Sequence, residues 1–220
     1  NLVIEVDGPE IPIMDGSADA FVEAIRQVGL RQQAARRRYI KVIKPVRVTV
    51  GDAVGELMPC DSRRFEVEID FADAIIGRQA YVFDAESGDF ARDLARARTF
   101  GFMSSVEQLW ANGYALGASL ENTVVIGDNQ IVNPEGLRFA DEFVRHKVLD
   151  AIGDLMLAGA PVLGHYRSYR GGHRLNAEMV KALLADKSAW EWSTVPARRE
   201  ATQADVGAML PAAALGPNVT

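Results

Sequence analysis

The order of the predicted elements indicates an α+β fold with antiparallel sheets. Short runs that are typical of strands come in clusters between helices, without the regular β–α–β alternation of a parallel sheet. The chain has 220 residues, of which 48% are hydrophobic and 25% are charged. This size and composition suit a globular protein of one or two domains with a substantial hydrophobic core.

The beginning of the chain predicts a strand over residues 2–6, a turn over 7–9 and a helix over about 20–28. Gly29 is expected to end that helix. Because the chain starts at Asn1 and enters a strand-like run at once, we expect it to be a piece of a longer protein.

The polar residues 31–38 carry four Arg and predict a connector. Beyond them, alternating or short apolar runs predict strands at 39–44, 45–50, 65–71, 79–83, 123–126 and 161–169. A helical pattern starts within residues 90–96, and further helices are predicted over 105–112, 141–158 and 176–184. From residue 194 on, Ala, Pro and Gly become frequent, which predicts a disordered tail over 194–220.

The charge and the cysteine content exclude several classes of protein. The net charge of -6 gives no sign of nucleic-acid binding. Cys60 is the only cysteine, so the chain has no internal disulfide and no Cys-x-x-Cys zinc site, which fits a reducing compartment. No apolar run reaches the roughly 18 to 20 residues that span a bilayer, and no signal peptide is visible.

The helix predicted at 141–158 carries His146, Asp150 and Asp154 at spacings of four residues. Four residues are about one helical turn, so these side chains share one stripe among apolar neighbours. A His and an Asp one turn apart can hold the same metal ion, and Asp154 is then a third ligand or a partner that orients an imidazole. A satisfied polar network at a helix surface is the other interpretation, and the pattern alone does not choose between them.

His173 follows a glycine pair, which lets backbone approach a ligand closely. If Asp154 pairs with His173, the pKa of the imidazole rises and the ring becomes a proton donor; an exposed loop histidine is the alternative. Lys147 can meet a phosphate as a point charge, although a solvated helix lysine is the commoner case. Thr99 can hydrogen-bond a developing oxyanion beside the apolar cluster that follows it, and ordinary core is the alternative for that cluster.

Several segments together resemble the UDP-3-O-acyl-N-acetylglucosamine deacetylase family, the zinc-dependent deacetylases of lipid A biosynthesis. They are residues 10–18, similar to the N-terminal-domain signature, 97–103, similar to the entry of the acyl-binding insert, 133–139 and 141–150, similar to the ligand helix, and 172–176, similar to the catalytic-histidine loop. The likeness covers about residues 1–193. It implies a two-layer α/β sandwich domain with an antiparallel sheet and a βαβ insert, plus the remnant of a similar N-terminal domain.

The resemblance also implies the domain boundaries. The expected parts are a remnant of domain I at 1–30, a linker at 31–38, domain II at 39–193 with its acyl-binding insert at about 97–126, and the tail at 194–220. The family's remaining zinc ligand and its general base form a Glu-His pair, which this sequence lacks. His165 stands at no ligand position of the family.

The resemblance implies a role for each candidate residue. The expected catalytic and metal-binding residues are His146 and Asp150 as Zn²⁺ ligands, His173 as general acid, Asp154 as its carboxylate partner, and Thr99 at the tetrahedral oxyanion. The expected substrate-binding residues are Lys147 at the diphosphate, Phe71 at the uracil ring, and Phe100, Phe102, Val106 and Leu120 at the fatty acyl chain.

The implied activity is zinc-dependent hydrolysis of the N-acetyl group of UDP-3-O-acyl-N-acetylglucosamine, which releases acetate. The implied setting is the cytoplasm of a Gram-negative bacterium, with a monomeric protein that makes at most transient contact with the inner membrane face. Without the Glu-His pair, the chain alone is expected to bind zinc weakly, to be inactive and to expose apolar surface. The alternatives are a non-catalytic module that binds a UDP-sugar or an acyl chain, and a metal hydrolase with another substrate.

Overall fold

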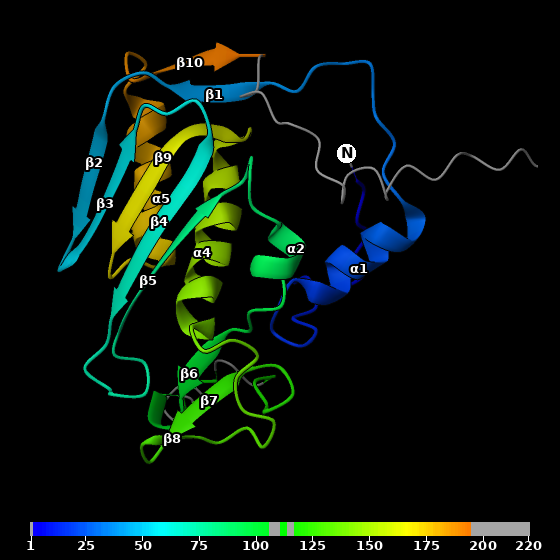
Figure 1. The fold of residues 1–220 in the computed structure, drawn as a ribbon, viewed down its shortest axis with the longest axis vertical. Coiled ribbons are helices and arrows are strands. Elements are labelled where there is room, and N and C mark those ends of the chain that lie inside the picture. Colours follow the sequence, from blue (N-terminus) through cyan, green and yellow to red (C-terminus); the bar gives the residue numbers. More distant parts are fainter. Residues whose placement is uncertain (1, 106–110, 114–116, 195–220) are drawn as a thin grey trace, which may run out of the picture.

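A computed structural model describes residues 2–105, 111–113 and 117–194 of the chain. It confirms the α+β fold: two helices cover one face of a seven-stranded sheet, and a small three-stranded sheet extends from one end of this sandwich (Figure 1). Among the helices of the described ranges, none is long and apolar enough to cross a membrane.

The main sheet is built around β9 (Val162–Tyr169), which has β3 (Ala53–Met58) antiparallel on one side and β4 (Arg63–Asp70) parallel on the other. The remaining strands are β1 (Tyr39–Val42), β2 (Val46–Val50), β5 (Arg78–Asp84) and β10 (Trp190–Ser193). Since β9 is also parallel to β1, the sheet is mixed, whereas the sequence predicts antiparallel sheets. The long connection from β4 to β9 passes through a helix, and such a crossover is what parallel strands require.

The second layer consists of α4 (Glu142–Leu155), continued by a 3-10 turn at Met156–Ala158, and α5 (His173–Ala185). Both helices lie against the same face of the main sheet (Figure 1). Side chains at alternate positions of the strands meet the apolar stripes of the helices there. Members of this core are Leu57, Phe65, Val67, Tyr166, Val148, Met179 and Leu183.

The small sheet begins in the range predicted for the insert, about 97–126, and continues beyond it to Ile131. β6 (Phe100–Phe102) lies parallel to β7 (Val124–Gly127), and β8 (Gln130–Ile131) is antiparallel to β7. A parallel pair of consecutive strands needs a crossover between them, as in the predicted βαβ unit. The helix predicted at 105–112 falls mostly outside the described residues.

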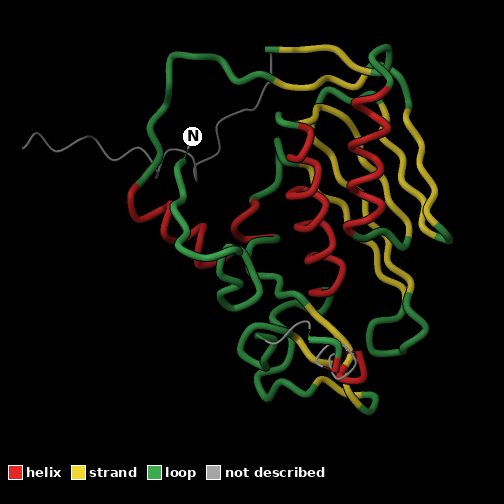
Figure 2. Tube along the Cα trace, turned by 180° about the vertical axis from the view of Figure 1, so that it is seen from behind, coloured by secondary structure: helices red, strands yellow, loops and turns green. Residues whose placement is uncertain are grey.

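The N-terminal segment, residues 2–38, is less buried than the rest of the described chain. α1 (Asp19–Val28) is confirmed, and Gly29 ends it with a φ of 75°, but none of its residues is buried. Figure 2 shows the connection from α1 to β1 running over residues 29–38 without a helix or strand. Residues 2–6 pair with no strand of the described chain, so that prediction is wrong; an apolar run forms a strand only where a neighbouring strand satisfies its backbone.

The expected exposure of apolar surface is found in this same N-terminal segment. Its exposed large apolar side chains are Leu2, Val3, Ile4, Val6, Ile11, Ile13, Met14, Val28 and Leu30. Four strands, β3, β6, β8 and β10, are missing from the predicted strand ranges, and α5 begins at His173 rather than at 176. The predicted tail lies outside the described residues from 195 on.

Candidate active site

The candidate site starts from His146, which the second turn of α4 buries to 7% exposure. Its Nδ1 lies 2.9 Å from the carbonyl oxygen of Ala97. A carbonyl can only accept, so Nδ1 carries the proton and the lone pair of Nε2 is available to a ligand. Burial lowers the pKa of His146 and outweighs the opposite effect of Asp150, which favours the neutral ring that metal coordination needs.

Asp150 lies one helical turn beyond His146. Its Oδ1 is 3.3 Å from Nε2 of His146, and its Oδ2 is 3.0 Å from Nζ of Lys147. The side chain of Asp150 is only 10% exposed. An imidazole nitrogen and a carboxylate oxygen therefore point to the same small volume, and the lysine supplies a cation beside it.

Asp154, another turn along, pairs with the second histidine. Its Oδ2 accepts hydrogen bonds from Nδ1 of His173 and from Nδ2 of Asn176, both at 2.8 Å. The hydroxyl of Tyr166, buried on β9, donates in turn to Oδ1 of Asn176 at 2.6 Å. Burial alone raises the pKa of Asp154, but the hydrogen bonds from His173 and Asn176 outweigh it, so the pKa is lowered and the carboxylate stays charged.

His173 is the first residue of α5, directly after Gly172 in an extended conformation. With Nδ1 held by Asp154, its Nε2 lies 3.9 Å from Oδ2 of Asp150, and 69% of the side chain is exposed. The hydrogen bond to Asp154 raises the pKa of His173, although burial opposes it. The two histidines thus differ: a buried neutral ring on one side of Asp150 and an accessible ring that favours protonation on the other.

Thr99 comes two residues after the carbonyl that holds His146, just before β6. Its backbone is fixed on both sides, because its N–H donates to the carbonyl of Gly16 and its carbonyl accepts from the N–H of Val124, both at 2.8 Å. Phe100 follows, and its ring centroid lies 6.4 Å from that of His146 and 5.4 Å from Nζ of Lys147.

The three predicted substrate-binding aromatics form one cluster at the edge of this site. The ring of Phe71, at the end of β4, lies 5.9 Å from that of Phe100 and 6.2 Å from that of Phe102, between centroids. Leu120 is 41% exposed on the connection between β6 and β7. Val106 lies outside the described residues. The structure therefore brings Phe71, Phe100 and Phe102 together beside Lys147.

His146 and Asp150 have the donor chemistry of a zinc site, an imidazole nitrogen and a carboxylate oxygen. The part of the chain that the structure describes contains no group of three or more His, Cys, Asp and Glu that could hold a metal ion. His165 lies on β9, where its Nε2 is 3.1 Å from Oε2 of Glu66 on the neighbouring strand. The two residues on α4 therefore offer two donors, fewer than the three protein ligands that a catalytic zinc site usually has.

The comparison with known families decides the relationship. The family described as LpxC, UDP-3-O-acyl N-acetylglycosamine deacetylase, matches residues 1–185. The chain belongs to the LpxC family. Relatives named UDP-3-O-acyl-N-acetylglucosamine deacetylase, from Brucella ovis, Brucella canis and Brucella melitensis, are each 59% identical to it over 192 residues, which cover 87% of this chain and 67% of the relative.

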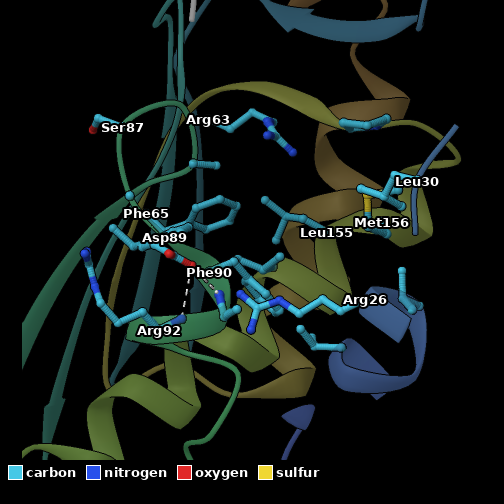
Figure 3. A pocket seen from close by; sticks show the side chains of 18 of the residues that line it. Arg26, Leu30, Arg63, Phe65, Ser87, Asp89, Phe90, Arg92, Leu155 and Met156 are labelled. Atoms are coloured by element: carbon cyan, nitrogen blue, oxygen red, sulfur yellow. Dashed lines mark hydrogen bonds between the residues drawn. The ribbon is translucent and has the colours of Figure 1, made fainter. Parts of the chain in front are cut away.

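This LpxC family member also contains a large cavity away from His146 (Figure 3). About 1100 Å³ in volume, it lies between α1, α2 (Phe90–Asp93), the sheet and the end of α4. Arg26 and Leu30 approach it from the α1 side, and Leu155 and Met156 from α4 (Figure 3). No histidine lines it, and Asp89, the carboxylate in its wall, caps α2 by accepting from two backbone N–H groups.

Three residues of the candidate site were not predicted from the sequence. The carbonyl of Ala97, the amide of Asn176 and the hydroxyl of Tyr166 all act through partners that are 10 to 49 residues away in the chain. A carbonyl leaves no mark in a sequence. For Asn176, the available signal was its position three residues after His173 on one helical face.

Proposed function

We propose that the protein to which this chain belongs hydrolyses the N-acetyl group of UDP-3-O-acyl-N-acetylglucosamine and releases acetate, in the lipid A pathway. The observation that carries the proposal is the convergence on Asp150 of two histidines with different environments. One is buried and neutral, as a metal ligand must be, and the other is accessible and held by a carboxylate, as a proton donor must be.

His146 and Asp150 would hold Zn²⁺ in this proposal. The fit rests on the free lone pair of Nε2, the neighbouring carboxylate and the burial of both side chains. When bound, zinc polarises the amide carbonyl and makes a water molecule a better nucleophile. The third ligand and the general base are expected from the family's Glu-His pair, so the residues of this chain supply only part of the centre.

His173 would protonate the amine that leaves the acetyl carbon. Its Nδ1–H donates to Asp154, which leaves Nε2 as the atom that carries the transferred proton. Asn176, itself held by the hydroxyl of Tyr166, donates to Asp154, so the imidazole keeps its orientation while the proton moves. Thr99, fixed by its backbone, would donate to the oxygen that becomes negative.

The substrate would lie across the aromatic cluster beside the metal site. Lys147 offers a cation for the diphosphate, and Phe71 a ring for the uracil. Phe100, Phe102, Leu120 and Val106, the last outside the described residues, would contact the fatty acyl chain. We further propose a monomer in the cytoplasm that meets the inner membrane face transiently.

The second candidate is a binding module for a UDP-sugar or an acyl chain, without catalysis. A deacetylase needs a base and a complete metal site, so a Glu-His pair encoded shortly before Asn1 would favour the enzyme, and its lack there would favour the binding module. Protection of the folded protein against heat by UDP is expected for the deacetylase and for a module that binds a UDP-sugar, and not for a metal hydrolase with an unrelated substrate.

Acetate release separates the two candidates. The 220-residue chain is compared with the same chain joined to the amino-terminal part of the Brucella ovis relative. We expect turnover of UDP-3-O-acyl-N-acetylglucosamine and one zinc per chain for the joined protein, and neither for the chain alone. Binding of the substrate by the joined protein without acetate release would favour the binding module, and rapid turnover by the chain alone would contradict the proposed assignment of the missing groups.

A further inference from the structure

A buried ion pair joins the two segments that carry site residues, because Arg98 precedes Thr99 and Glu142 lies one turn before His146 on α4. Glu142, in the first turn of α4, is completely buried, and Arg98 is 3% exposed. Nε of Arg98 donates to Oε1 of Glu142 at 2.9 Å, and a terminal nitrogen of the guanidinium donates to Oε2 at 3.2 Å. The backbone N–H of Arg98 also donates to Oε1, at 3.0 Å. The carboxylate therefore holds both the side chain and the backbone of Arg98.

The same pair holds the loop that leads into α4. The backbone N–H of Arg138 donates to Oε2 of Glu142 at 2.6 Å. The guanidinium of Arg98 reaches Glu135 at 2.6 Å and the carbonyl of Gly136 at 2.7 Å. Every part of the ion pair is therefore hydrogen-bonded, which is the condition under which a buried pair of charges keeps one geometry.

The N-terminal segment joins this network. The guanidinium of Arg138 lies 2.7 Å from a carboxylate oxygen of Asp15. Gly16 follows with a φ of 81°, and its carbonyl accepts from the N–H of Thr99. A Cβ on Gly16 would lie 2.0 Å from the carbonyl oxygen of Asn122, so only glycine allows this close contact with the insert.

Arg98 stands between two residues that the proposed reaction uses. The carbonyl of Ala97 fixes the ring of His146, and Thr99 follows on the other side. A shift of the backbone at Arg98 would therefore move the acceptor of the histidine and the threonine together.

We propose that Arg98 and Glu142 are positioning residues of the active site, which fix the tautomer and orientation of His146 and the place of Thr99. The role of Thr99 rests on the proposed function, whereas the effect on His146 does not. Replacing a satisfied buried pair by apolar side chains of similar size is often neutral for stability, so the pair's contribution lies in the geometry that it imposes. Residues that orient a metal ligand typically change metal affinity or activity by about 10- to 100-fold when altered.

The first test uses the 220-residue chain and the nitrogen NMR signals of the His146 ring. We expect a single tautomer with the proton on Nδ1 in the wild-type chain, and a mixture in Glu142→Gln and Arg98→Lys. The matched control is Glu86→Gln, which breaks the ion pair of Glu86 with Arg63 in the wall of the large cavity, 3.1 Å between Nε and Oε1. Folded variants with an unchanged His146 tautomer would overturn the proposal.

A double variant, Arg98→Met with Glu142→Leu, addresses loss of folding in the single variants. It removes the charges together and leaves none of them buried alone. We expect it to fold and to show the mixed His146 tautomer. A folded double variant that keeps the wild-type tautomer would overturn the proposal.

The second test uses the protein joined to its amino-terminal part. We expect Arg98→Lys to lower zinc affinity and kcat by about 10- to 100-fold, with KM changed far less. Unchanged zinc affinity and kcat in this variant would overturn the proposal. If the joined protein releases no acetate at all while the NMR result holds, the proposed function fails and the positioning of His146 stands.

Discussion

The two regions along α4 differ in the way that their polar groups are arranged. Near the middle of α4, every polar side-chain atom of His146 and Asp150 has a close partner: the carbonyl of Ala97, the other residue of the pair, or Lys147. At its C-terminal end, Leu155 and the following Met156 line a cavity of about 1100 Å³, and the carboxylate in the wall of that cavity, Asp89, caps a short helix. The end of α4 that faces the cavity therefore has fewer potential metal ligands and proton donors than its middle.

Convergence of titratable groups, rather than the volume of a cavity, therefore singles out the candidate site. The cavity faces α1, a helix with no buried residue, and the N-terminal segment around it exposes much apolar surface. The middle of α4 has a small set of polar groups in fixed positions, which is what catalysis requires. Variants in the middle of α4 should therefore change zinc binding, whereas variants at its C-terminal end should not.

The largest effect is expected from the proposed ligands. His146→Ala or Asp150→Ala in the joined protein should lower zinc affinity by more than about 100-fold, because even residues that only orient a ligand change it by 10- to 100-fold. Zinc per chain after dialysis is measured by atomic emission. Met156→Ala, in the cavity wall, is the matched control and should retain its zinc. Equal loss from all three variants would remove the distinction between the two regions.

The next effect concerns the proton donor. His173→Gln should lower kcat by about 10²- to 10⁴-fold, the usual contribution of general acid catalysis, while zinc content is maintained. The control is His165→Gln, which changes the histidine that pairs with Glu66 on the sheet. Steady-state acetate release gives both values. A fall in kcat for His165→Gln as large as that for His173→Gln would show that His173 has no special role as a proton donor.

A third prediction concerns stability and pH. The burial of Glu142 raises its pKa, but the hydrogen bonds from Arg98 and Arg138 outweigh this, so the folded pKa lies below the unfolded value of about 4.3. The stabilising contribution is thus present above that value and is lost as the pH falls through the folded pKa. Glu142→Gln should lower the free energy of unfolding by about 3–5 kcal/mol at neutral pH.

Urea unfolding of the 220-residue chain at several pH values measures this contribution. The difference between wild type and Glu142→Gln should shrink as the pH is lowered from 7 towards 3. A difference that stays constant over this range would show that the charge of Glu142 makes no contribution.

The smallest effect is expected at the rim of the cavity. Arg92 forms an ion pair with Asp93 at 2.7 Å, and its side chain is 72% exposed. Exposed pairs of this kind contribute little, so Arg92→Ala should change the free energy of unfolding by less than about 1 kcal/mol and leave the zinc content of the joined protein unchanged. Loss of zinc in Arg92→Ala would couple the cavity to the metal site and contradict the separation of the two regions.

Local patterns in the sequence predicted the parts of the site that lie on one element. The helix around His146, its one-turn spacing to Asp150 and the alternation in β4 all follow from periodicity. The pairing of Arg98 with Glu142 joins residues 44 positions apart, and neither residue differs in the sequence from an ordinary surface charge. The strand predicted at 2–6 failed for the related reason that pairing is not a local property.

The hydrogen bond between His173 and Asp154 was predicted in part from the sequence. Both residues were singled out from the sequence, but only as a conditional pair, because 19 positions and a strand separate them. The fold brings them together by laying α5 beside α4 on the same face of the sheet. Sequence reasoning therefore supplied the chemistry of the site, and the packing of the two helices supplied its geometry.

The position of zinc tests the central claim most directly. Crystals of the joined protein are grown with zinc, and the metal is located by its anomalous scattering. We expect one strong peak in contact with both Nε2 of His146 and the carboxylate of Asp150, with His173 nearby and not bound. A peak at another set of residues, or full acetate release from crystals without zinc at this position, would contradict that claim.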